Sequence, residues 1–115
     1  METRLVHVRA NVRNLEKAIN WYCKYLGFEV DSVWPSETPV YASFNSQEGA
    51  VFSIGVAETV PAGARFNFAI KDVDAFWEYL KDKVEVVEQL YDTSYGTRKF
   101  TIRDLDGNEL GFSKG

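Results

Sequence analysis

The chain has little of several features that mark other classes of protein. Its 115 residues contain one cysteine, Cys23, which excludes an intrachain disulfide and fits a reducing compartment. No apolar run approaches the roughly 20 residues that span a bilayer, and the N-terminal stretch lacks the apolar segment of a signal peptide. We therefore expect a cytoplasmic protein with no membrane partner. Lys and Arg total 13 against 17 Asp and Glu, without a basic cluster, so no nucleic-acid partner is expected.

What the sequence does contain is a plan that occurs twice. Asn14 and Asp72 each precede an amphipathic stretch, which predicts helices over 15–26 and from about 73 to 83. These two caps are 58 positions apart, and so are Gly49 and Gly107 in two predicted turns. A duplication of about half the chain accounts for both offsets.

Each half combines one helix with four strands. Alternating patterns and turn signals predict strands at 4–12, 28–34, 40–46 and 50–57, and again at 64–71, 84–91, 97–103 and 109–113. The predicted fold class is α+β, with two βαβββ modules whose curved mixed sheets form a cleft. We expect a single domain over 1–115, with module 1 at about 1–57, a linker at 58–63 and module 2 at about 64–115.

The helix of each module must cover the apolar face of its sheet, which leaves a helix-free face. Alternation places a mostly polar set of side chains there: His7, Arg9, Asn11, Tyr41, Ser43, Val51, Ser53, Gly55, Arg65, Asn67, Ala69, Lys99, Thr101, Glu109 and Gly111. If the two sheets curve together, these residues line one ligand cavity; the alternative is a solvated or partner-covered surface. Trp34, Tyr91 and Tyr95 would border the cavity or lie at a rim or dimer interface.

The charges on these faces indicate a class of ligand. Arg9, Arg65 and Lys99 are cations, with Glu109 as the one anion, in a protein of net charge -4. We therefore predict an anionic or carbonyl-rich small molecule as the partner. The ligand-binding residues expected are Arg9, Asn11, Tyr41, Ser53, Arg65, Asn67, Lys99, Thr101 and Glu109. A further acidic group, Glu85, Glu88 and Asp92, is interpreted as a solvated edge.

Two segments within this paired plan carry a family resemblance. VRNLEKAINWYCKYLGF and the ending RDLDGNELGF resemble the vicinal oxygen chelate superfamily, which contains glyoxalase I, extradiol dioxygenases, and fosfomycin and bleomycin resistance proteins. The resemblance covers essentially the whole chain, although Leu105 replaces the proline that is usual in the second motif. It implies the glyoxalase/bleomycin resistance-like fold and a homodimer.

The resemblance also implies metal ligands at four positions, which map to His7, Ser53, Arg65 and Gly111. A catalytic divalent ion needs about three His, carboxylate or thiolate ligands, and an arginine would repel it. We therefore predict no metal and no other cofactor, with a bound divalent metal as the alternative. His7 is then either a strand histidine that hydrogen-bonds a neighbour, or a catalytic base or ligand contact.

The functional prediction that follows is a metal-free small-molecule binding protein with a sequestration or resistance-like role. The alternative is an enzyme. It would be a divergent glyoxalase-like lyase or isomerase or a dioxygenase-family member, with or without a metal, or an enzyme that uses His7 as base with arginines stabilising an enolate. A shared fold does not decide between them.

Overall fold

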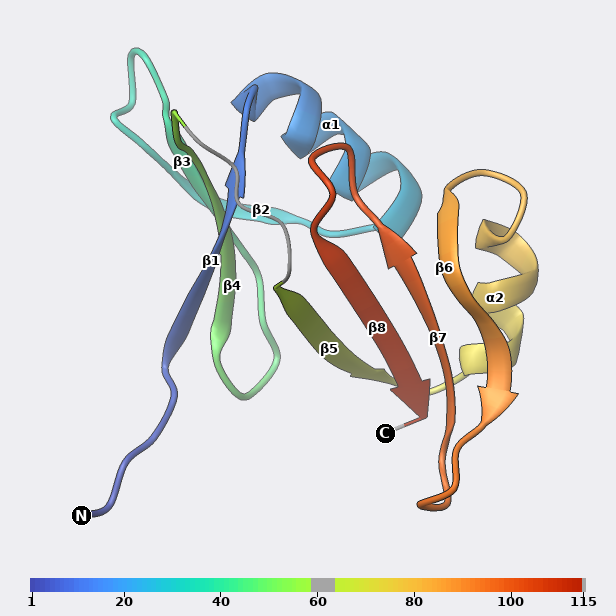
Figure 1. Cartoon of the computed structure of the whole chain (residues 1–115). Helices are drawn as coiled ribbons and strands as arrows, with labels where there is room; N and C mark the ends of the chain where they lie inside the picture. The colour runs from blue at the N-terminus through green and yellow to red at the C-terminus, as the bar shows by residue number, and fades with distance from the viewer. Residues whose placement is uncertain (59–63, 115) are drawn as a thin grey trace. The chain divides into compact units, whose positions relative to one another are not determined.

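The computed structural model describes residues 1–58 and 64–114, and it divides the chain into two compact units (Figure 1). The predicted linker at 58–63 lies, apart from Glu58, outside the described residues. Neither helix within the described ranges has the length and apolar character needed to cross a membrane.

The first unit holds one helix and four strands. Its elements are β1 (His7–Val12), α1 (Leu15–Leu26), β2 (Val30–Trp34), β3 (Tyr41–Phe44) and β4 (Val51–Val56). The four strands form sheet 1, in the order β1-β4-β3-β2. β1 runs parallel to β4, and the other neighbouring pairs are antiparallel.

Local chemistry fixes the ends of α1, and aromatic packing seats it on sheet 1. The side chain of Asn14 accepts a hydrogen bond from the Lys17 backbone N–H at 2.9 Å, and Gly27 ends the helix with a left-handed φ of 70°. Tyr22 is almost fully buried, with its ring 5.4 Å from that of Phe44 and 5.6 Å from that of Phe52. The apolar face of sheet 1 is thereby covered by α1.

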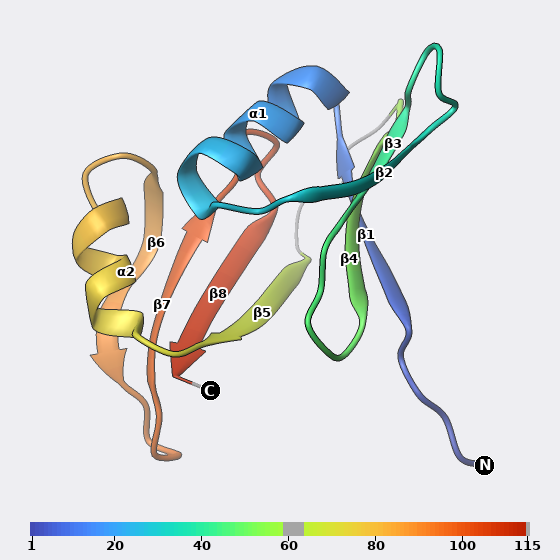
Figure 2. The same ribbon diagram turned by 180° about the vertical axis from the view of Figure 1, so that it is seen from behind.

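The second unit repeats this arrangement. Its elements are β5 (Arg65–Ile70), α2 (Val73–Leu80), β6 (Glu85–Asp92), β7 (Arg98–Arg103) and β8 (Glu109–Lys114). The four strands form sheet 2, in the order β5-β8-β7-β6, and β5 runs parallel to β8. Figure 2 shows α2 beside the strands of its own sheet.

The core of the second unit is again aromatic. Asp72 caps α2 by accepting a hydrogen bond from the Ala75 N–H at 3.0 Å. The ring of Phe76 lies 5.1 Å from that of Phe112, and the fully buried ring of Phe100 stacks on Phe112 at 5.4 Å. The helix-free face of sheet 2 therefore lies opposite this packed layer.

The structure confirms the predicted α+β fold and all ten predicted elements. Several ends shift by one or two residues, and two ends shift by three. The first strand begins at His7 rather than at residue 4, because β1 pairs with β4 only from His7 onward. The second helix ends at Leu80 rather than at Lys83. Beyond Leu80 the chain makes a tight turn, in which the Lys83 N–H donates to the Leu80 carbonyl at 2.8 Å.

Candidate functional site

Strand register brings the predicted polar side chains of the first unit onto one face of sheet 1. Arg9 pairs across the strands with Ser53, Ser53 pairs with Ser43, and Tyr41 pairs with Gly55. Residues that face each other across neighbouring strands share a face of the sheet. The predicted helix-free face of this unit is therefore present in the structure.

A three-residue hydrogen-bonded cluster lies on this face. The Nε2 atom of His7 is 2.8 Å from the hydroxyl oxygen of Tyr41 and 2.9 Å from the hydroxyl oxygen of Ser53. Ser53 is fully buried and donates its proton to the carbonyl oxygen of Val8 at 2.8 Å. His7 thus hydrogen-bonds two neighbours, and these hydrogen bonds are compatible with each of the roles predicted for it.

Arg9 lies flat against the sheet beside this cluster. One Nη nitrogen donates to the carbonyl oxygen of Val56 at 3.0 Å, and a Cβ atom added at Gly55 would overlap the guanidinium. Arg9 is the one charged side chain that β1, β3 and β4 place on this face, and it has no carboxylate partner among the described residues. Its remaining N–H donors are available to an acceptor outside the chain.

The second unit places its predicted residues on the helix-free face of sheet 2, but its arginine is already paired. Arg65 Nη2 lies 2.8 Å from a carboxylate oxygen of Glu109, and Nη1 lies 3.0 Å from one of Glu88. The hydrogen bond to Glu109 raises the pKa of Arg65. The two arginines predicted as ligand anchors thus differ, because Arg9 has no carboxylate partner among the described residues whereas Arg65 is paired with two carboxylates.

Glu88, which the sequence analysis interpreted as part of a solvated edge, lies on the helix-free face of sheet 2 and is paired there. It faces Thr101 across the sheet and accepts that buried hydroxyl's hydrogen bond at 2.7 Å. This bond, and then the charges of Arg65 and Lys99, lower the pKa of Glu88 against the opposing effect of burial. The prediction that Glu109 is the only anion on the helix-free faces is therefore wrong.

The other predicted residues of sheet 2 gather around a glycine. A Cβ atom added at Gly111 would overlap the side-chain oxygen of Asn67 and would lie 3.2 Å from Cε of Lys99. Lys99 forms no hydrogen bond or ion pair within the described part of the chain, although its charge acts on Glu88. Lys99 and Asn67 therefore cover the centre of this face.

The four positions that the family resemblance assigns to metal ligands hold a donor set that does not fit a divalent ion. The Ser53 hydroxyl donates to the Val8 carbonyl and is hydrogen-bonded to His7, and the guanidinium at position 65 is cationic. Gly111 has no side chain, so His7 is the one ordinary ligand of the four. In residues 1–58 and 64–114, no three His, Cys, Asp or Glu side chains are grouped so that they could hold a metal.

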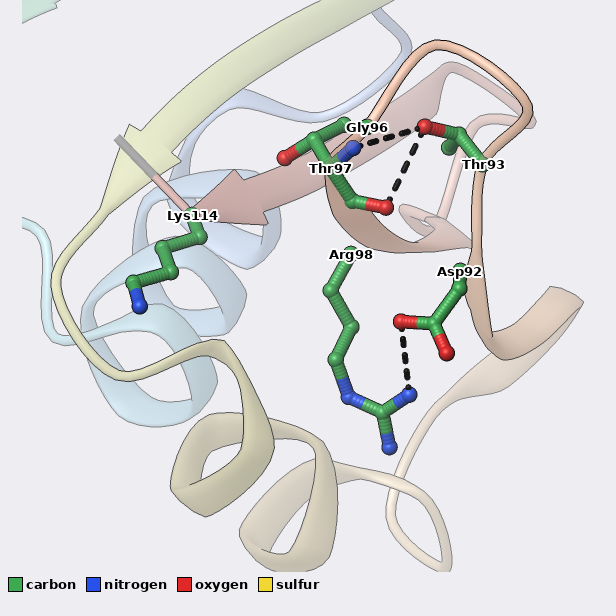
Figure 3. Close-up of a pocket in the computed structure, with 6 residues that line it drawn as sticks. All are labelled: Asp92, Thr93, Gly96, Thr97, Arg98 and Lys114. Carbon is green, nitrogen blue, oxygen red and sulfur yellow. Dashed lines mark hydrogen bonds and ion pairs between the residues drawn. The ribbon is translucent and has the colours of Figure 1, made fainter.

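A cavity of about 590 Å³ lies in the second unit, away from these residues (Figure 3). It is lined by Asp92, Thr93, Gly96, Thr97, Arg98 and Lys114. Arg98 in this lining forms ion pairs with Asp74 of α2 at 2.6 Å and with Asp92 at 3.1 Å. The cavity therefore lies on the side of sheet 2 that α2 covers. None of the predicted ligand-binding residues lines it.

Comparison with known proteins identifies relatives over nearly the whole chain. Residues 4–112 match the model of the Glyoxalase/Bleomycin resistance protein/Dioxygenase superfamily. A probable trivalent organoarsenical cleaving enzyme of Bacillus subtilis (strain 168) is 34% identical over 119 aligned positions, which cover 95% of this chain and 78% of the relative. A trivalent organoarsenical cleaving enzyme of Bacillus sp. (strain MD1) is 32% identical, with 95% and 71% covered.

Solved structures agree on the fold. A member of the same superfamily from Sphaerobacter thermophilus DSM 20745 superimposes with a TM-score of 0.81 at 19% identity, over 99% of this chain and 98% of that one. At this identity the likeness concerns the architecture alone.

Proposed function

The chain belongs to the glyoxalase/bleomycin resistance protein/dioxygenase superfamily, and from that premise we propose that it binds an anionic or carbonyl-rich small molecule without a resident metal ion. The observation that carries the proposal is Arg9, a guanidinium with no carboxylate partner in the described chain. A carboxylate ligand would complete its hydrogen bonds with matching geometry. Tyr41 and Asn11, on the same face of sheet 1, supply further polar groups.

The role of sheet 2 in this proposal is secondary. Arg65 is neutralised by two carboxylates, so binding an anion there would require breaking an existing ion pair. Lys99, which has no ion-pair partner in the described part of the chain, is the cation of that face that remains able to bind an anion.

A titration with and without Arg9 tests the proposal. We expect a panel of 2-oxo acids and dicarboxylates to bind more tightly than their neutral methyl esters, and Arg9→Gln to weaken the binding of the acids about 10- to 100-fold. The matched control is Lys17→Gln, which removes one positive charge from the exposed surface of α1 on the other face of sheet 1. Esters that bind as well as acids, or equal losses in both variants, would refute the proposed ligand class.

An enzymatic function is the second candidate, because both curated relatives are named as enzymes that cleave trivalent organoarsenicals. Trivalent arsenic is a soft centre, and soft centres select thiolate ligands. This chain has one cysteine, Cys23 on α1, and burial raises the pKa of its thiol, which disfavours the thiolate. We therefore propose that this chain does not share the cleavage activity.

An assay of the purified protein separates the two candidates. With phenylarsine oxide as substrate, we expect no release of inorganic arsenic above a no-protein control. Cleavage that is lost in Cys23→Ser would restore the enzymatic candidate and assign the thiol to it.

We also propose a homodimer, the state that the family resemblance implies. The exposed side of the first unit supports it, because β2 is an edge strand of sheet 1 and Trp34 on it is 68% exposed. Size-exclusion chromatography with light scattering is expected to return twice the chain mass of 13.1 kDa. A monomer across the concentration range would contradict this part of the proposal.

A further inference from the structure

The hydrogen-bonded cluster on sheet 1 has only one consistent arrangement of protons. The hydroxyl oxygen of Ser53 lies 2.8 Å from the carbonyl oxygen of Val8 and 2.9 Å from Nε2 of His7. A carbonyl has no proton to donate, so the single hydroxyl proton of Ser53 must lie on the contact with Val8. Ser53 therefore accepts the hydrogen bond from His7, and Nε2 of His7 carries the proton of that bond.

The same reasoning extends to Tyr41. Its hydroxyl oxygen is 2.8 Å from the Nε2 atom that already carries a proton, so Tyr41 also accepts, and one N–H is shared between two oxygens. The phenolic proton must then point away from His7. This proton has no acceptor within residues 1–58 and 64–114, and Nδ1 of His7 forms no hydrogen bond there.

We propose that Ser53 is a positioning residue that fixes His7 in the Nε2–H tautomer and thereby makes the Tyr41 hydroxyl a hydrogen-bond donor to the ligand. This inference rests on the proposed function and narrows its ligand. Arg9 lies across Gly55 and Tyr41 is the cross-strand partner of Gly55, so a cationic donor and a neutral donor flank one point of the sheet. Two donors on one face suit an oxygen acceptor, as in a carboxylate or ketone, whereas a protonated amine only donates and would leave both donors without an acceptor.

The tautomer is directly measurable because His7 is the only histidine in the chain. A long-range ¹H–¹⁵N correlation spectrum of the full chain, recorded at alkaline pH where imidazole is neutral, is expected to show a protonated Nε2 and an unprotonated Nδ1. Ser53→Ala removes the acceptor and lets Tyr41 donate to Nε2, so the two nitrogen shifts should move toward each other or exchange.

Two further variants make the test specific. Ser43→Ala removes a hydroxyl of the same face that bonds to Ser32 at 2.7 Å instead, so it should leave the His7 signals unchanged. Tyr41→Phe should also preserve the Nε2–H tautomer, since Ser53 is retained, while weakening 2-oxo acid binding about two- to tenfold.

The outcomes separate this inference from the proposed function. A proton on Nδ1 in the wild type, or a tautomer that changes in Tyr41→Phe and not in Ser53→Ala, would overturn the role of Ser53. If the spectra are as expected but acids bind no better than their esters, the tautomer assignment stands and the proposed ligand class fails.

Discussion

At the scale of single residues, the two arginines of the helix-free faces differ in their partners. Arg9 has no carboxylate partner among the described residues, whereas Arg65 forms two ion pairs. Arg9 and Arg65 look alike in sequence, since each lies on the first strand of its unit. Arg9 rests on a glycine and a backbone carbonyl, whereas Arg65 lies between Glu88 and Glu109. A guanidinium in two ion pairs has most of its donors used, which makes Arg9 the stronger anchor for an anion.

Gly55→Ala tests whether the position of Arg9 matters as well as its charge. The added methyl would displace the guanidinium and break its bond to Val56, without changing the net charge. Gly55 has no left-handed φ, so we expect the free energy of unfolding to change by less than about 1 kcal/mol. Calorimetric titration with a 2-oxo acid should show affinity reduced about tenfold.

The control for this substitution lies in the second unit. Gly111→Ala would displace Asn67 and Lys99 rather than Arg9, so its effect on affinity should be smaller. Equal losses in the two glycine variants would contradict the leading role of Arg9.

Thr101→Val tests the ionic cluster of sheet 2. Thr101 is fully buried, and its hydrogen bond is the largest effect that lowers the pKa of Glu88. Because the folded-state pKa lies below the unfolded value, ionised Glu88 contributes stability above the unfolded pKa, and this stability is lost as pH falls through the folded pKa. The side chain of Glu88 is 36% exposed, so solvent screening keeps the contribution small.

Urea unfolding at neutral pH is expected to show Thr101→Val less stable than the wild type by about 1 kcal/mol. The difference should shrink at about pH 3, where free carboxyl groups of this kind are protonated. Thr97→Val, in the β6–β7 loop where the hydroxyl donates no hydrogen bond within the described residues, serves as the control. A difference that does not vary with pH would assign the loss to packing instead of to Glu88.

At the scale of elements, the two units use the same plan with different turn chemistry. The turn before β8 is built on Asp104, whose carboxylate accepts bonds from the backbone N–H of Asp106 at 2.8 Å and of Asn108 at 2.9 Å, and from the Asn108 side chain at 2.9 Å. The turn before β4 relies on Ser46, which donates to the carbonyl of Glu48 at 2.9 Å. Asp104 is buried and Ser46 is exposed, so the two turns should differ in their contribution to stability.

Alanine at each turn measures that difference. Asp104→Ala removes the buried carboxylate that accepts these three hydrogen bonds, and we expect it to lower the free energy of unfolding by about 2–3 kcal/mol. Ser46→Ala removes an exposed bond, and a loss of about 0.5 kcal/mol is expected. Chemical denaturation of both variants checks the ranking, and equal losses would show that the Asp104 network adds nothing beyond an ordinary turn.

Strand β6 contains the side chain whose position could not be predicted from the sequence. Caps, periodicity and turn residues are local signals, and they were enough to find α1 and the helix-free face of sheet 1. β6 contains register shifts on both sides of Glu88, which turn that side chain toward Thr101 and Arg65. A bulge changes which residues share a face, and simple alternation does not reveal it. The contacts of His7 were equally out of reach, because they depend on the pairing of β1 with the distant β4.

At the scale of the whole molecule, the chain keeps the family's arrangement of helices and strands. The match to the superfamily spans residues 4–112, and both units keep the βαβββ order. Yet Ser53, Arg65 and Gly111 stand at three of the four positions that the resemblance assigns to metal ligands, and the first two are engaged in bonds within the chain. Fold and site chemistry are thus separable properties of this chain.

Metal titration tests that separation in the intact protein. A site that binds only the folded chain stabilises it by about 2.7 kcal/mol at a hundredfold excess over the dissociation constant, which corresponds to a rise in melting temperature on the order of 10 °C. We expect protein purified without added metal to contain no stoichiometric metal by elemental analysis, and its melting temperature to stay unchanged with Ni, Zn, Mn or Fe(II). One equivalent of retained metal, or a shift that grows with metal concentration and is reversed by chelator, would contradict the metal-free proposal. Such a result would require donors other than these four, since an arginine and a glycine cannot supply the missing ligands.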